Sequence, residues 1–111
     1  MGTRSLIAVE QQDKGFKSIY VHYDGYPKHV GRVLTGYYPN KEDADKLLKV
    51  GDIVGFEADG SYEAFNSRPR EKTRAIKSKN YLRLKDLGEQ MMVEYIYVYN
   101  LDGSIDCHTM T

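Results

Sequence analysis

Hydrophobic and polar residues alternate along two segments near the N-terminus, which is the pattern of half-buried β-strands. The first segment covers residues 5–11 and the second covers residues 16–23, with the turn-forming sequence Asp13-Lys14-Gly15 between them. The pattern therefore predicts an antiparallel hairpin at the start of the chain.

The length of the turn decides which residues of this hairpin face each other. If the turn closes between Gln12 and Phe16, Val9 lies opposite Ile19 on the face that packs into the core. The opposite face then gathers four functional side chains, which are Arg4, Tyr20, His22 and Asp24.

Two helices are predicted after this hairpin. Pro27 suits a first helical position, because its ring fixes φ and its missing N–H would have no helical partner there, so a helix is expected over about residues 28–34. Asn40 is a preferred N-cap residue, and Gly51 suits a left-handed C-terminal residue. The second helix should lie between these two residues.

Three further strands are predicted in the rest of the chain. One covers residues 52–58, and residues 92–99 and 104–109 form a second hairpin. The pattern is weak over residues 60–87, where we expect an irregular insert that contains a basic loop. Within it, residues 81–87 fit either a strand or a short helix.

A chain of 111 residues is long enough for one domain with its own hydrophobic core. We therefore expect residues 1–111 to form a single α+β domain. Its sheet should be mainly antiparallel, built from two hairpins plus one strand, with two or three helices packed on one face.

Composition limits the partners and the location of the protein. Lys plus Arg number 16 and Asp plus Glu number 16, so no overall field attracts nucleic acid or an anionic membrane. The apolar runs are too short to predict a membrane span. The single Cys107 excludes an internal disulfide and favours a reducing, cytoplasmic location.

The densest group of functional side chains lies where the second strand leads into the first helix. Such a junction exposes backbone N–H groups and the positive end of a helix dipole, which favour an anion. Guanidinium and ammonium groups nearby would add charge-assisted hydrogen bonds to a phosphate or carboxylate. The candidate ligand-binding residues are Arg4, Tyr20, His22, Asp24, Gly25, Tyr26, Lys28, His29 and Arg32.

Other interpretations of the junction stay open. His22 or His29 could act as a general base, and with Asp24 they could hold a divalent metal. Alternatively, the residues only form the turn and start the helix. We predict no catalytic residue, metal or cofactor.

A basic stretch between residues 68 and 79 holds six basic residues and one acidic residue. It is either a solvated loop or a surface that binds a nucleotide, RNA or an acidic protein. No aromatic residue interrupts the stretch, which argues against binding of single-stranded nucleic acid. The basic residues are Arg68, Arg70, Lys72, Arg74, Lys77 and Lys79.

The chain has ten Tyr and no Trp, and Tyr95, Tyr97 and Tyr99 alternate along one predicted strand. Such a row either covers a sheet face beneath a helix or forms a recognition surface for a base, a sugar or a second subunit. Exposed tyrosines on a hairpin at the edge of a sheet would favour a homo-oligomer.

Three sequence features together carry a resemblance: the opening Gly-Thr-Arg-Ser, the later Asp-Gly-Tyr-Pro, and Glu-Tyr-Ile-Tyr-Val-Tyr before the last hairpin turn. The chain resembles a family of small, largely uncharacterised proteins of bacteriophages and prophages. The resemblance implies a compact α+β domain without an established reaction, and a setting in which accessory phage proteins disable a host factor or sequester a nucleotide signal.

Three functional hypotheses follow. The leading one is a non-enzymatic phage accessory protein that binds an anionic, nucleotide-like small molecule. The second is an inhibitor that binds a host protein through its basic 68–79 loop. The third is a small hydrolase or nucleotide-modifying enzyme that uses His22 or His29 as its base.

Overall fold

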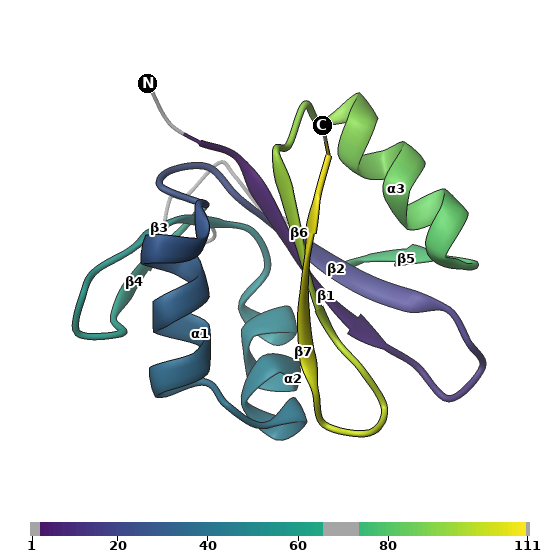
Figure 1. Cartoon of the computed structure of the whole chain (residues 1–111), viewed down its shortest axis with the longest axis horizontal. Coiled ribbons are helices and arrows are strands. Elements are labelled where there is room, and N and C mark those ends of the chain that lie inside the picture. Colours follow the sequence, from purple (N-terminus) through teal and green to yellow (C-terminus); the bar gives the residue numbers. More distant parts are fainter. Residues whose placement is uncertain (1–2, 66–73, 111) are drawn as a thin grey trace.

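The computed structural model describes residues 3–65 and 74–110, which build one mixed sheet of seven strands and three helices (Figure 1). The strand order is β4-β3-β2-β1-β6-β7, and β5 also pairs with β2. The strands are β1 (Ser5–Glu10), β2 (Phe16–Val21), β3 (Ile53–Phe56), β4 (Tyr62–Ala64), β5 (Ile76–Ser78), β6 (Tyr95–Tyr99) and β7 (Ile105–Thr109). The helices are α1 (Arg32–Tyr37), which continues a π-helical turn η1 (Pro27–Gly31), α2 (Lys41–Val50) and α3 (Tyr81–Gln90).

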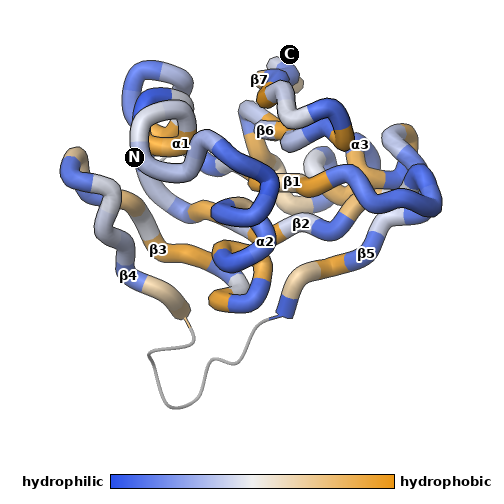
Figure 2. The backbone as a smooth tube through the Cα atoms, turned by 90° about the horizontal axis from the view of Figure 1, so that it is seen from below, coloured by the Kyte–Doolittle hydropathy of each residue, from blue (hydrophilic) through white to orange (hydrophobic). Residues whose placement is uncertain are grey.

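The fold confirms the predicted α+β class with a mostly antiparallel sheet. The pairs β1–β2, β2–β5, β3–β4 and β6–β7 are antiparallel. Two parallel pairs, β1–β6 and β2–β3, join the hairpins into one sheet. Figure 2 shows the strands following one another across the molecule from β7 to β4.

The register of the first hairpin differs from the prediction by two residues. Ile7 pairs with Ile19, and Val9 pairs with Lys17. The reason is a longer turn, in which the Gln11 N–H donates to the Gly15 carbonyl at 2.8 Å. Because the shift is even, every side chain stays on its predicted face although its partner changes.

Helices cover both faces of the sheet, so the prediction that they pack on one face was wrong (Figure 1). Helices α1 and α2 pack on the face that carries Ile7 and Ile19. Helix α3 packs on the opposite face, where Leu6 and Ala8 of β1 are also buried. Since both faces of the central strand are apolar, both need a helical cover.

Three of the four predicted helix boundaries are confirmed, and the first helix ends at Tyr37, three residues later than expected. Pro27 begins η1, which runs on into α1. At the start of α2, the Asn40 N–H donates to the Asp43 carboxylate at 3.3 Å. Gly51 ends the helix with φ at 89°, a conformation that glycine adopts at little cost.

The second half of the chain contains more regular structure than expected. The strand at 52–58 and the C-terminal hairpin are present as β3, β6 and β7. Residues 60–87, expected as an irregular insert, contain β4, β5 and the first turns of α3. No helix among the described residues is long and apolar enough to cross a membrane.

The tyrosine row of β6 lies mostly in the core. Tyr97 and Tyr99 are almost fully buried beneath α1, and Tyr95 is partly buried. The Tyr97 hydroxyl donates to the Gly25 carbonyl and the Tyr99 hydroxyl donates to the Tyr38 carbonyl, both at 2.6 Å. These side chains therefore cover the sheet and hold the segments around α1, and Tyr97 and Tyr99 do not form an exposed recognition surface.

Gly25 lies where the junction before η1 crosses the start of β1. Its N–H donates to the Thr3 carbonyl at 2.7 Å. A Cβ at this position would lie 2.5 Å from the Ser5 Oγ and 2.8 Å from the Thr3 carbonyl oxygen. The backbone here tolerates no side chain.

We predict that Gly25→Ala lowers the free energy of unfolding by about 1–3 kcal/mol, because the methyl group must push β1 and the junction apart. Urea denaturation measures the loss. The matched control is Gly36→Ala in α1, where a Cβ meets nothing within 4 Å. That change should stabilise the helix by about 0.5–1 kcal/mol. Equal effects of the two substitutions would contradict the close approach at Gly25.

Candidate functional site

Most of the predicted ligand-binding residues fall into two groups on opposite faces of the sheet, and the rest form the turn between β2 and η1. Tyr20 packs against the cluster beneath α3, and the charge of Arg4 acts on its hydroxyl. Lys28, His29 and Arg32 belong to η1 and the start of α1, which pack on the other face. Alternation along the strands separates the groups, so Arg4 does not converge with the basic residues of the helix.

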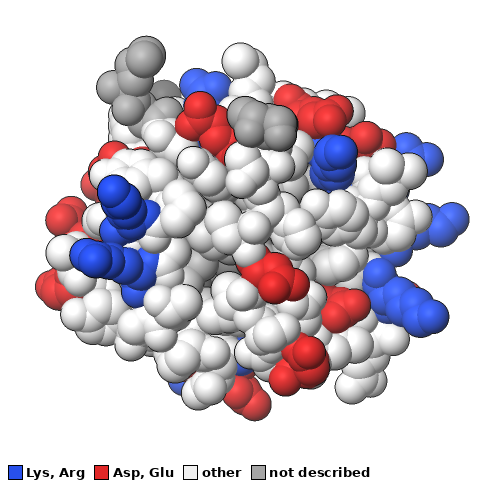
Figure 3. All heavy atoms as spheres, in the orientation of Figure 1, with Lys and Arg blue, Asp and Glu red and all other residues white. Residues whose placement is uncertain are grey.

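A cavity of about 360 Å³ lies beside η1 and α1. Three of the predicted ligand-binding residues line it together. Figure 3 shows Lys and Arg side chains gathered on the side of the molecule where α1 lies. The lining residues are Lys28, His29, Arg32, Val33, Tyr37 and Ala58.

His29 connects the cavity to the sheet. Its Nε2 lies 2.7 Å from the Phe56 carbonyl oxygen at the end of β3. Because a carbonyl oxygen only accepts, Nε2 carries the hydrogen and Nδ1 is the nitrogen left for another contact. The bond fixes the ring at the cavity wall.

Lys28 and Arg32 supply the charge of the cavity. They lie one helical turn apart, and both side chains are exposed. Among the described residues neither forms an ion pair, in contrast to Lys41 with Asp45 and Lys77 with Asp13. Their positive charges are therefore available to an anion.

The cavity also has an apolar and aromatic side. Val33 is buried, whereas Tyr37 is 54% exposed. The Tyr37 ring also lies against Gly60, where a Cβ would lie 2.6 Å from its Cγ. An exposed ring held on one side by the backbone offers a stacking surface for a planar ligand.

The second group is an aromatic cluster at the end of β2. The Tyr20 hydroxyl and His22 Nδ1 are 2.8 Å apart, and the His22 ring packs edge-on against Tyr23 and Phe65. Burial raises the pKa of the Tyr20 hydroxyl, and the charge of Arg4 partly offsets this. The cluster holds the end of the strand, and we assign it no ligand.

The remaining predicted residues form the turn between β2 and η1. Asp24 has φ at 55°, which Asp tolerates better than most residues. Its side chain and that of Tyr26 are exposed, while Gly25 is buried. This geometry favours the interpretation that Asp-Gly-Tyr-Pro starts the helix.

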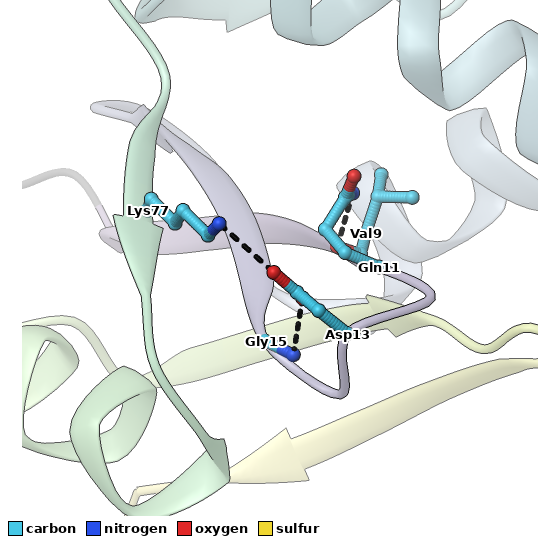
Figure 4. A network of polar contacts seen from close by, with 5 residues as sticks. All are labelled: Val9, Gln11, Asp13, Gly15 and Lys77. Atoms are coloured by element: carbon cyan, nitrogen blue, oxygen red, sulfur yellow. Dashed lines mark hydrogen bonds and ion pairs between the residues drawn. The ribbon is translucent and has the colours of Figure 1, made fainter.

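The basic stretch is not one continuous loop. Arg68, Arg70 and Lys72 lie outside the described residues. Lys77 lies in β5, and its Nζ is 2.9 Å from the Asp13 carboxylate in the first hairpin turn (Figure 4). Lys77 and the Gly15 N–H hold the pKa of this exposed carboxyl below its usual value.

No group of three or more potential metal-ligating side chains occurs in the described ranges 3–65 and 74–110. Partial burial raises the pKa of the Cys107 thiol, which disfavours its thiolate form.

Sequence reasoning missed the roles of Tyr37, Ala58 and the Phe56 carbonyl. Tyr37 is the last residue of α1, three residues beyond the predicted end of this helix. An aromatic residue five positions after Arg32 was the available signal. The approach of β3 to His29 depends on tertiary packing, so no local pattern shows it.

No protein-family model, curated protein or solved structure matches this chain. The resemblance to phage proteins therefore stays a prediction.

The two buried tyrosines predict how stability changes at alkaline pH. Burial raises the pKa of the Tyr97 and Tyr99 hydroxyls well above the usual value near 10.0. Above pH 10 the unfolded chain loses these protons while the folded chain keeps them, so their stabilisation is present below pH 10 and is lost as pH rises further.

The free energy of unfolding should fall above pH 10 by up to about 1.4 kcal/mol per pH unit for each tyrosine. The double variant Tyr97→Phe with Tyr99→Phe should show a shallower fall, because only the two hydroxyls differ. Urea unfolding between pH 9 and 11 measures both slopes. Parallel slopes for the two proteins would contradict the raised pKa values.

Proposed function

We propose that this protein is a non-enzymatic phage accessory protein that binds an anionic, nucleotide-like small molecule in the cavity beside α1. The observation that carries the proposal is the convergence of Lys28, His29 and Arg32 on one cavity, with no neutralising carboxylate among the lining residues that the structure describes. Unpaired cations on a concave surface favour a phosphate or carboxylate.

The size and the mixed lining of the cavity suit a small organic anion. Its volume of about 360 Å³ is within the range of small-molecule sites. Lys28 and Arg32 would contact the phosphate, and His29 Nδ1 would add a polar contact. The exposed Tyr37 ring would stack on a base.

The lining favours binding over turnover. Among residues 3–65 and 74–110, the lining contains no Ser, Cys, Asp or Glu. His29 holds the sheet through Nε2, so the ring is fixed at the wall by a structural bond. A protein that binds without turnover can sequester a signal, which is the role that the resemblance to phage proteins suggests.

The test is a thermal-shift screen with mono-, di- and cyclic nucleotides and ADP-ribose derivatives, followed by calorimetric titration of each compound that shifts the melting temperature. At about 100 times its dissociation constant, a ligand adds roughly 2.7 kcal/mol of stability. In a domain of this size that is about 10 °C or more.

Arg32→Glu should weaken the titrated affinity at least about tenfold, because it removes one phosphate contact and adds a repelling charge. The matched control is Lys46→Glu, which makes the same change of charge on an exposed α2 residue outside the cavity lining. Equal loss in both variants, or no shift with any compound, contradicts the proposal. Recovery of a chemically altered nucleotide would favour the hydrolase hypothesis instead.

A further inference from the structure

The outer edge of β7 is open, because no described strand pairs with it. In Figure 1 β7 runs down the front of the molecule, with α1 and α2 on one side and α3 on the other. Figure 3, in the same orientation, shows uncharged surface across this face that is interrupted by several Asp and Glu side chains. An open edge offers unpaired backbone groups to another strand.

The hydrogen bonds to β6 fix which residues of β7 face outward. The Asn100 N–H donates to the Ser104 carbonyl, and the Met110 N–H donates to the Glu94 carbonyl. Bonded and non-bonded pairs alternate in an antiparallel ladder, so the even-numbered residues of β7 bond to β6. The backbone groups of Ile105, Cys107 and Thr109 therefore point to the open edge.

We propose that β7 pairs with β7 of a second copy of this chain, antiparallel and centred on Cys107. The register places Cys107 opposite its own counterpart and Ile105 opposite Thr109 of the second copy. All of these residues offer outward backbone groups, so each pair exchanges both backbone hydrogen bonds. The two sheets become one.

Charge complementarity selects a second copy as the occupant and selects this register. With Cys107 at the centre, Asp106 lies opposite His108 of the second copy, and the pair occurs twice by symmetry. Opposite non-bonded residues have close side chains, which favours an acidic group beside an imidazole. Moving the two-fold centre by one residue in either direction, which shifts the register by two residues, would instead put Asp106 opposite Asp106 or His108 opposite His108.

Both side chains are already held in place for this contact. The Asp106 carboxylate accepts from the Asn100 side-chain amide at 2.8 Å through one oxygen, which leaves the other oxygen for the second copy. The His108 ring packs against Tyr81 of α3 with ring centres 5.0 Å apart. Less side-chain entropy is then lost when the two β7 edges pair.

The dimer would also cover the face of β7 that carries Ile105 and Cys107. A cavity of about 300 Å³ lies between β7 and the turns of η1 and α1, and Pro27, Tyr97, Ile105 and Cys107 are among its lining residues. In the proposed register, Ile105, Cys107 and Thr109 of the second copy project on this same face, because opposite residues in a sheet share a face. Pairing would therefore shield apolar surface.

Light scattering after size exclusion tests the association over a range of protein concentrations. We expect a dimer that dissociates on dilution. His108→Asp should weaken it about tenfold, because it creates two like-charge pairs. Asp106→His should also weaken it, and the exchanged double variant Asp106→His with His108→Asp should restore it. Circular dichroism melts check that each variant is folded. A monomer at every concentration, or an exchange that restores nothing, overturns the proposal.

Cross-linking tests the register, because Cys107 is the only cysteine. A short bis-maleimide adds one thiol to each of its double bonds and should link two wild-type chains. In the control, Thr109→Cys with Cys107→Ser, the two thiols would lie four residues out of register, about 14 Å apart. A reagent too short for that distance should not link them. Equal cross-linking of both proteins would contradict the register.

Discussion

The hydrogen bond from the Tyr97 hydroxyl to the Gly25 carbonyl connects the centre of the sheet to the point where β2 leads into the helices. Tyr97 is almost fully buried on β6, and Gly25 is pressed against the start of β1. A buried carbonyl without a partner would cost about 1–3 kcal/mol, so this bond determines where the chain leaves the sheet. The direction of η1 and α1 follows from it.

The cavity beside α1 depends on that direction. η1 and α1 carry Lys28, His29 and Arg32 to one place, and the bond from His29 to the Phe56 carbonyl holds the same turns against β3. The buried Gly25 thus positions the exposed, positively charged lining of the cavity. Residues that bind ligands are often found on segments that a rigid sheet positions.

The sequence predicted local structure well and tertiary structure only in part. Alternation identified β1, β2, β3, β6 and β7, and Pro27, Asn40 and Gly51 marked helix ends, because these signals act over a few residues. The short strands β4 and β5 and the helix α3 lie where the pattern was weak, so they were not predicted. The two-residue error in register came from a turn whose length composition does not determine. The grouping of Lys28, His29 and Arg32 follows from helical spacing, whereas their separation from Arg4 depends on which face each element covers.

Hydrogen–deuterium exchange of Tyr97→Phe tests most directly whether this buried bond holds the junction. The control is Tyr95→Phe, because Tyr95 is on the same strand and face but is only partly buried. We predict that amides of residues 25–31 exchange faster in Tyr97→Phe than in the control, by more than the change in the central strands. Unchanged exchange at the junction, or the same acceleration throughout the sheet, would contradict the account.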